Sequence, residues 1–390
     1  MSIRENGNHT IKVLLIAQFG KSGGTRTYLS LLLDLLTKLD INIFLIADTN
    51  SLDEVKTLSD DYPHVKIFSP SFPLDPYPSS FPLCLVKTVW QIRDIIQYFP
   101  FDLTIVSSSS GEAWIETLLL PWPALYVIHT YPFWGRHSRR LGNVFWKLIN
   151  RSLQSKNLLV TVSEASKKVI HESWLLDKNI ESRIHIVYNP SRYENNSVSG
   201  KLKTNLKDEE FCILTVGSVE NHKNPYFWID IALTVKLLAP EANIQFVWVG
   251  DGSFLDAIRT YVQLYSWITF TGSSSSPDSY YCKASLYLQP SLVESQGMAV
   301  LEAASFSVPA LVSDVGGLPE IVVDGETGYI LPVTSPWIYA NKIIELWKNP
   351  KVLAQLGVNA HQLQKTKFSR NIWEDIMLDK VTDLTNYNYT

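Results

Sequence analysis

Residues 294–331 read ESQGMAVLEAASFSVPALVSDVGGLPEIVVDGETGYIL. A short apolar run at 286–288 precedes this stretch, and two further apolar runs lie within it, at 309–313 and 329–331. The segment that opens at Gly297, between the first two runs, has helical character. Short buried-type strands that alternate with helices predict a parallel sheet covered on both faces.

The same alternation extends through both halves of the chain. In the first half, the predicted strands are residues 11–17, 41–47, 103–106, 125–128 and 158–162. Ser163 is placed to cap a helix that runs to about Ser173. In the second half, further strands are predicted at 211–216, 244–249 and 268–270. We therefore predict an α/β fold of two Rossmann-like, doubly wound domains that face each other across a ligand-binding cleft.

A polar stretch interrupts this alternation. Residues 191–210 show no strong periodicity, which is typical of a linker. The predicted organisation is a first domain at 1–192, a linker at 193–210 and a second domain at 211–366. The remaining residues, 367–390, form a separate C-terminal segment.

Composition limits the classes of function. Of the 390 residues, 46% are hydrophobic and 18% are charged, as in globular proteins, and the net charge of −4 gives no basic field for nucleic acid. The three cysteines share no metal-binding or CxxC spacing, which favours a reducing compartment. The polar residues 1–10 lack the apolar core of a signal peptide, and the apolar stretch 114–128 is broken by Glu116 and two prolines. We expect a cytoplasmic protein.

Several familiar catalytic motifs are absent. Gly20-Lys21-Ser22 is similar to the end of a P-loop, but Leu15 stands where the motif needs glycine. His171-Glu172 begins an HExxH pattern that Leu175 ends. No GxSxG occurs, and no GxGxxG follows the first strand, so hydrolase and dehydrogenase functions lose their main support.

Glu294 and Glu302 are the strongest candidates for a functional pair. Gly297 and Met298 would open the intervening helix, so that their backbone N–H groups form a site for a diphosphate. Glu294, on the loop before the helix, could accept hydrogen bonds from sugar hydroxyls. Glu302, about one turn inside, could hold a ribose through two hydroxyls. Taken alone, two acids at this spacing are more often exposed residues that flank a helix.

The surrounding sequence changes that balance. The patterns E-x-x-G-x-x-x-x-E-A, D-x-G-G-x-P-E and D-G-x-T-G follow one another in this order. The run from 213 to 331 thereby resembles the donor-binding domain of the family 4 glycosyltransferases. This resemblance implies a GT-B fold, transfer with retention of anomeric configuration, and a nucleotide-diphosphate sugar as donor without a metal or other cofactor. It covers nearly the whole chain but is strong only in the second half.

The resemblance assigns roles to individual residues of the second half. Glu302 is similar to the acid that binds the donor ribose, and Glu294 to the acid that contacts the transferred sugar. Gly297 and Met298 correspond to backbone contacts with phosphate, and Lys223 to a cation on the diphosphate. Ser218 stands where the family commonly has arginine, so one positive charge is missing unless Arg26 of the first domain supplies it.

The first half carries weaker matches. Gly23 and Gly24 resemble a glycine pair that lets the backbone approach the donor. His129, at the end of a predicted strand, resembles a cleft histidine near the reacting carbon, although a lone histidine is usually structural. By the same resemblance, the first domain binds the acceptor and the C-terminal segment forms a helix that crosses back onto it.

The predicted function is transfer of a hexose-type sugar to a glycan, a lipid-linked acceptor or a small molecule, with His129 and Glu294 as catalytic residues. Three alternatives stay open: a nucleotide-sugar epimerase, a phosphorylase of the same fold, and a sugar-nucleotide binder without catalysis. The phosphorylase would need a cofactor-bearing lysine that the sequence does not identify.

A basic and aromatic segment at 134–156 suggests where the protein works. On a helix, Arg140, Lys147 and Arg151 would form one stripe with aromatic and aliphatic residues beside it. This pattern is typical of a helix that rests on anionic lipid. It predicts a peripheral association with the inner face of the membrane, and a merely solvated helix is the alternative.

Overall fold

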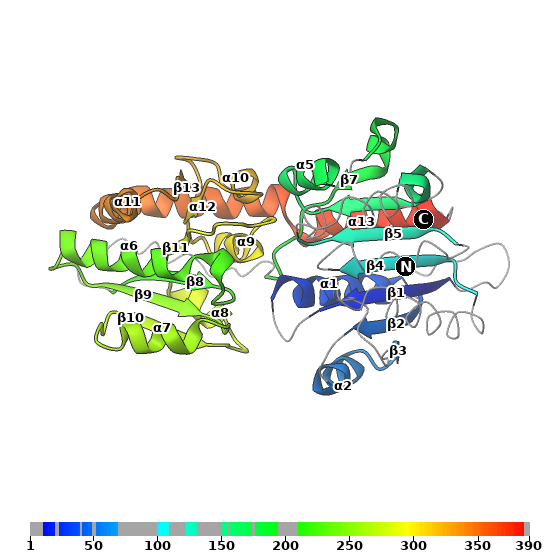
Figure 1. Cartoon of the computed structure of the whole chain (residues 1–390), viewed down its shortest axis with the longest axis horizontal. Helices are drawn as coiled ribbons and strands as arrows, with labels where there is room; N and C mark the ends of the chain where they lie inside the picture. Colours follow the sequence, from blue (N-terminus) through cyan, green and yellow to red (C-terminus); the bar gives the residue numbers. More distant parts are fainter. Residues whose placement is uncertain are drawn as a thin grey trace. The chain divides into compact units, whose positions relative to one another are not determined.

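The computed structural model describes residues 11–19, 23–39, 41–48, 52–68, 100–108, 122–130, 150–154, 157–173, 176–193 and 210–385. The chain divides into two compact units. The first comprises Met1–Tyr188 with Trp373–Thr390, and the second comprises Asn189–Ile372. Each unit is built on its own parallel sheet with helices packed against it (Figure 1).

The first unit has a seven-stranded sheet in the order β3-β2-β1-β4-β5-β6-β7. Its strands are β1 (Lys12–Gln18), β2 (Asn42–Asp48), β3 (Lys66–Phe68), β4 (Leu103–Ser108), β5 (Ala124–Ile128), β6 (Leu158–Thr161) and β7 (Ile184–Ile186). Its described helices before residue 189 include α1 (Gly24–Lys38), α2 (Leu52–Asp61), α5 (Glu164–Ser173) and the 3-10 helix η4 (Lys178–Arg183).

Local sequence explains how these elements begin. The middle residues of β1 are apolar and fully buried, because helices cover the sheet on both faces. Gly23 precedes α1 with φ of 105° and ψ of −178°, a backbone conformation that is essentially restricted to glycine. The Ser163 side chain accepts a hydrogen bond from the Ser166 amide at 3.0 Å, so it caps α5 as predicted.

The last helix, α13 (Arg370–Thr385), belongs to the first unit from Trp373 onward, although it follows the second unit in sequence (Figure 1, red). Trp373, Met377 and Val381 are buried in the same apolar core as β1 and α1. The Tyr28 hydroxyl lies 3.7 Å from the sulfur of Met377. These contacts make α13 an integral part of the first unit's core.

The second unit has a six-stranded sheet in the order β10-β9-β8-β11-β12-β13. Its strands are β8 (Phe211–Val216), β9 (Ile244–Val249), β10 (Ile268–Gly272), β11 (Leu286–Gln289), β12 (Ala310–Ser313) and β13 (Gly328–Leu331). Its helices are η5 (Asn221–Lys223), α6 (Pro225–Leu238), α7 (Leu255–Val262), α8 (Asp278–Lys283), α9 (Met298–Ser305), α10 (Leu318–Ile321), α11 (Pro336–Lys348) and α12 (Pro350–Lys367).

Tryptophans stabilise the core of the second unit. Trp228 on α6 and Trp248 on β9 are fully buried, with ring centroids 5.4 Å apart. Both indole N–H groups find acceptors, Thr215 Oγ1 at 2.7 Å and the Gly217 carbonyl at 2.9 Å. Burial of these large rings, with their polar atoms satisfied, fixes the end of β8 from which the candidate site is built.

The prediction of two Rossmann-like parallel-sheet domains is confirmed. Every strand predicted from the sequence is present, with ends that agree to within two residues. Two strands were missed, β3 and β7, which are three residues long and lie at the edges of their sheet. The second unit begins at Asn189, earlier than the predicted boundary at residue 192, and most of the predicted linker lies outside the described residues.

Candidate active site

The candidate site of the second unit lies where its central strands end. β8 and β11 are adjacent and parallel, so the loops that follow them leave the same edge of the sheet. The loop after β8 carries Ser218 and Lys223, and the loop after β11 carries Glu294. Glycine at 297 and the start of α9 follow directly.

Lys223 and Glu294 form an ion pair between their Nζ and Oε2 atoms. The amide of Gln289, the last residue of β11, donates a second hydrogen bond of 2.6 Å to the same Glu294 oxygen. Only 16% of the Lys223 side chain and 14% of the Glu294 side chain are exposed. The structure therefore brings together two residues that lie 71 positions apart, and both were predicted to contact the donor.

The two loops are also joined through their backbones. The His222 carbonyl accepts a hydrogen bond of 2.8 Å from the Leu292 amide, and the Asn224 side chain donates to the Pro290 carbonyl at 3.2 Å. Asn224 has φ of 58°, in the left-handed region that asparagine tolerates better than most residues. The His222 imidazole has a lowered pKa because of burial and then the neighbouring Lys223 charge. These ties hold Lys223 against Glu294.

Ser218 is exposed on the loop after β8. Among the described residues, its hydroxyl has no hydrogen-bond partner and does not join the Lys223–Glu294 pair. Arg26, the proposed substitute for the missing arginine, lies in the first unit with its guanidinium 5.4 Å from the Phe19 ring centroid. Its Nη1 atom is buried and has no hydrogen-bond partner in the described part of the chain.

Gly297 sets the start of α9. Its φ of 102° turns the chain into the helix, and a Cβ at this position would lie 2.7 Å from a methyl carbon of Leu318. The positive φ therefore favours glycine, and a side chain at this position would have to displace that of Leu318. Met298 is the first residue of α9, where N–H groups lack intrahelical acceptors and the positive end of the helix dipole lies. This end of α9 follows Glu294 by only a few residues.

Glu302 is placed differently from Glu294. It lies in the second half of α9 and its side chain is only 5% exposed. Its Oε1 accepts from Nε of Arg192 at 2.8 Å, and its Oε2 accepts from the Tyr281 hydroxyl at 2.8 Å. Burial raises the pKa of the Glu302 carboxyl, while Arg192 and Tyr281 oppose that rise. The predicted ribose acid is thus already engaged by two protein donors.

Arg192 belongs to a segment, residues 189–193, that lies alongside α9 in space and is bonded to residues 296–305. The Gln296 side chain accepts from the Asn189 amide at 2.8 Å and donates to its carbonyl at 2.9 Å. The Ser305 hydroxyl donates to that of Ser191 at 2.8 Å. The sequence analysis gave this segment no role and missed Arg192, Tyr281 and Gln289.

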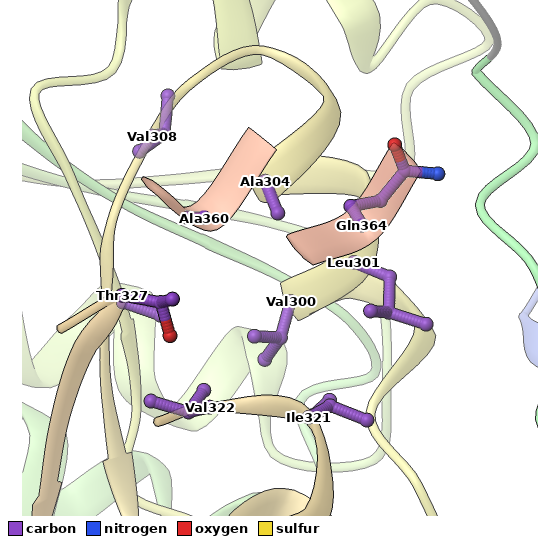
Figure 2. Close-up of a pocket in the computed structure, with 10 residues that line it drawn as sticks. Val300, Leu301, Ala304, Val308, Ile321, Val322, Thr327, Ala360 and Gln364 are labelled. Atoms are coloured by element: carbon purple, nitrogen blue, oxygen red, sulfur yellow. The ribbon is translucent and has the colours of Figure 1, made fainter. Parts of the chain in front are cut away.

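The opposite face of α9 lines a narrow, mainly apolar pocket. Val300, Leu301 and Ala304 line it from α9, and Gln364 lines it from α12 (Figure 2). The Gln364 side chain donates a hydrogen bond of 3.3 Å to the Phe368 carbonyl, just after the end of α12. None of the predicted site residues lines this pocket, so it is separate from the candidate site.

In the first unit, His129 follows β5 and is 8% exposed. Its Nε2 atom lies 3.0 Å from the Ser107 hydroxyl, and its ring centroid is 4.4 Å from that of Tyr28. Burial lowers the pKa of His129 to about 3, so the imidazole is neutral near pH 7. Gly23 and Gly24, at the start of α1, are exposed. The His129 environment is that of a neutral hydrogen-bonding group rather than a charged one.

Other predictions fall largely outside the described residues. Arg140 and Lys147 lie outside them, and Arg151 is exposed on a short helical stretch. Within the described ranges, no helix combines the length and apolar character that a membrane crossing requires. In the same ranges, no group of three or more histidine, cysteine, aspartate or glutamate side chains is arranged to hold a metal ion.

Solved structures define the class of fold. A glycosyltransferase from Rickettsia africae superimposes with a TM-score of 0.75 at 17% identity, covering 97% of this chain and 100% of that one. Anabaena HepE, in a structure with UDP and glucose, gives a TM-score of 0.70 at 19% identity, covering 96% of this chain and 100% of that one. The fold is that of the GT-B glycosyltransferases.

Two family models match in series. The model described as Glycosyltransferase Family 4 matches residues 22–191, and the model described as Glycosyl transferases group 1 matches residues 201–363. The chain belongs to the family 4 type glycosyltransferases.

Curated relatives match over only part of their length. An uncharacterized glycosyltransferase of Methanocaldococcus jannaschii is 30% identical over 207 residues, which are 52% of this chain and 54% of that protein. The N-acetyl-alpha-D-glucosaminyl L-malate synthase of Bacillus anthracis is 23% identical over 246 residues, which are 61% of this chain and 64% of that protein. The chain therefore spans less than two thirds of the length of these relatives.

Proposed function

We propose that this chain transfers a hexose-type sugar from a nucleoside diphosphate sugar to a glycan, a lipid-linked acceptor or a small molecule, with retention and without a metal. The observation that carries the proposal is the Lys223–Glu294 pair beside the start of α9. It offers a cation and helix N–H groups for a diphosphate, and a carboxylate for sugar hydroxyls. HepE, a protein of the same fold, has been solved with UDP-glucose, which supports a donor of this chemical class.

The proposed reaction uses these groups directly. The bond between the anomeric carbon and the diphosphate oxygen breaks, and a bond to the acceptor oxygen forms on the same face of the sugar. The acceptor proton passes to the departing phosphate oxygen. Lys223 and the N-terminus of α9 stabilise the negative charge that grows on that phosphate. Glu294 orients the sugar by accepting hydrogen bonds from its hydroxyls.

The neutral imidazole of His129 fits a hydrogen-bonding contact with the donor sugar rather than a charged one. Gly23 and Gly24 offer an exposed backbone turn to the donor. We further propose that the basic segment 134–156 rests on anionic lipid. A peripheral position at the membrane would suit a lipid-linked acceptor.

The deciding experiment supplies UDP-, GDP- and ADP-sugars with mixed oligosaccharide and lipid extracts, and measures the nucleoside diphosphate released. We expect release with one donor class, unchanged by EDTA, and a product whose anomeric proton coupling matches that of the donor. A strict need for Mn²⁺ or Mg²⁺, or an inverted product, would refute the corresponding part of the proposal. Recovery of an epimerised donor, or binding without release, would favour the alternatives.

A further inference from the structure

Arg192 forms an ion pair with Glu302, the predicted ribose acid, although Arg192 is not among the residues predicted to contact the donor. Arg192 lies between the two matched family models, which end at residue 191 and begin at residue 201. Its guanidinium engages both oxygens of Glu302, with Nε 2.8 Å from Oε1 and Nη2 3.2 Å from Oε2. Such two-point pairing of arginine with a carboxylate is strongly oriented.

The Glu302 carboxylate has little capacity left for a ligand. Two carboxylate oxygens offer about four acceptor positions. Arg192 occupies two of them, and the Tyr281 hydroxyl, 2.8 Å from Oε2, occupies a third. A ribose that presents two neighbouring hydroxyls needs two acceptor positions. At least one of the present protein donors must therefore leave when a ribose binds to Glu302.

Arg192 is the donor that can leave. Tyr281 is completely buried beneath α9, whereas 36% of the Arg192 side chain is exposed and Glu302 lies underneath it at 5%. The Arg192 guanidinium also lies 5.0 Å from the Tyr193 ring centroid, which gives it an alternative neighbour outside the pair. Because Asn189 and Ser191 are fastened to Gln296 and Ser305, the side chain can turn away while the backbone stays in place.

We propose that Arg192 covers the ribose-binding carboxylate of Glu302 and is displaced by the donor ribose, so that it sets how much the ribose hydroxyls contribute to donor affinity. This inference rests on the proposed function. Breaking the Arg192–Glu302 ion pair costs free energy, which offsets part of the free energy gained from the ribose contact. Removal of the arginine should therefore increase the dependence of binding on the ribose hydroxyls.

The test measures dissociation constants at pH 8 for UDP, GDP and ADP and for their 2′,3′-dideoxy forms, with wild-type protein and Arg192→Gln. The alkaline pH favours the ionised form of Glu302 once its cation is removed, because burial raises the pKa of this carboxyl. For the base that binds, we expect the ratio of the dideoxy to the ribo constant to rise about fivefold in Arg192→Gln, as for loss of a partly exposed ion pair. Arg192→Lys, which keeps the charge but loses the two-point geometry, should fall between.

Arg259→Gln provides the matched control, because this exposed arginine of the same unit donates to the Phe270 carbonyl and forms no ion pair within the described residues. Its ratio should equal that of the wild type. An unchanged ratio in Arg192→Gln, with both forms weakened equally, would reduce Arg192 to a structural role, and a lower ratio would make it a ribose contact. Either result overturns the inference. If wild-type protein binds none of the ribo forms, the proposed function itself fails.

Discussion

Lys223 and Glu294 form an ion pair that joins the loops after two neighbouring strands, β8 and β11. The pair aligns a cation with a carboxylate at the start of α9, where a helix dipole presents its positive end. A diphosphate that binds here must compete with Glu294 for Lys223. In the donor complex we therefore expect Lys223 to contact phosphate and Glu294 to turn towards the sugar.

The first prediction concerns this pair. Glu294→Ala should lower kcat about a hundredfold and change the apparent donor affinity by less than about threefold, because its sugar contacts matter most as the glycosidic bond breaks. Steady-state kinetics with the active donor measures both constants. Glu241→Ala, which removes an exposed glutamate of the same unit, is the control and should behave as wild type. Near-normal turnover in Glu294→Ala would rule out the assigned role.

The second prediction uses the buried position of Glu302. Its pKa is raised by burial, so the carboxyl takes up a proton at a pH at which an ordinary glutamate is still ionised. If ionised Glu302 holds the ribose, donor affinity should fall as the pH decreases through this raised pKa. Calorimetry with a nucleoside diphosphate sugar suits the test, because its diester phosphates do not titrate near neutral pH.

Glu302→Gln is the matched variant for that experiment. It should bind the donor more weakly above the transition and show no change in affinity across the same pH range. A wild-type affinity that stays constant down to the ordinary pKa of glutamate would contradict a ribose contact by ionised Glu302.

The third prediction concerns His129. The pKa of His129 is about 3 in the folded chain and about 6.5 in the unfolded chain. Between these two pH values, the unfolded chain therefore binds a proton at this residue and the folded chain does not. This group's contribution to stability is present above that pH and is lost at about 1.4 kcal/mol per pH unit as the pH falls towards 3. Urea unfolding at pH 7 and pH 5 should show a smaller loss for His129→Gln than for the wild type. Equal losses would mean that His129 is accessible and titrates normally.

The fourth prediction compares two glycines with positive φ in the second unit. Alanine at Gly297 would bring a Cβ within 2.7 Å of Leu318, whereas nothing lies within 4 Å of a Cβ at Gly325. We expect Gly297→Ala to destabilise the unit by about 1–3 kcal/mol beyond the backbone cost that both variants share. It should also weaken donor binding through displacement of the start of α9. Thermal unfolding and calorimetry of the two variants give the comparison, and identical behaviour would contradict it.

The fifth prediction tests the basic stripe. Cosedimentation should show binding to vesicles that contain anionic lipid. The binding should decrease as salt rises from about 50 to about 300 mM, because salt screens the attraction between surface charges. The triple variant Arg140→Ala, Lys147→Ala, Arg151→Ala should bind less. Equal binding to neutral vesicles, or none to either kind, would leave only a solvated helix.

The strands and the donor-side residues could be predicted because their signals are local. A short apolar run followed by a small-residue loop identifies a buried strand and the edge where ligands bind. Gln289 is a polar residue at the end of such a run, and this position is the local feature that identifies it as a candidate neighbour of Glu294. The edge strands β3 and β7 carry no comparable signal, because three residues with one neighbouring strand need not be uniformly apolar.

Arg192 could not have been predicted in the same way. Its partner Glu302 lies 110 positions away, and the segment around it is polar, as a linker would be. Only the fold shows that residues 189–193 pack against α9 and belong to the second unit. A pairing between distant residues depends on the tertiary path of the chain, which neither periodicity nor spacing reports.

The position of α13 has a consequence for how the protein is made. Trp373, Met377 and Val381 complete the core of a unit whose other residues precede residue 189. During synthesis the second unit emerges from the ribosome as one continuous segment and can fold at once, whereas the first must wait for the whole of the second to be translated. During that interval the apolar side chains of α1 that pack against α13, Tyr28 among them, lack this cover. We therefore expect slow translation of the second unit to lower the yield of native protein.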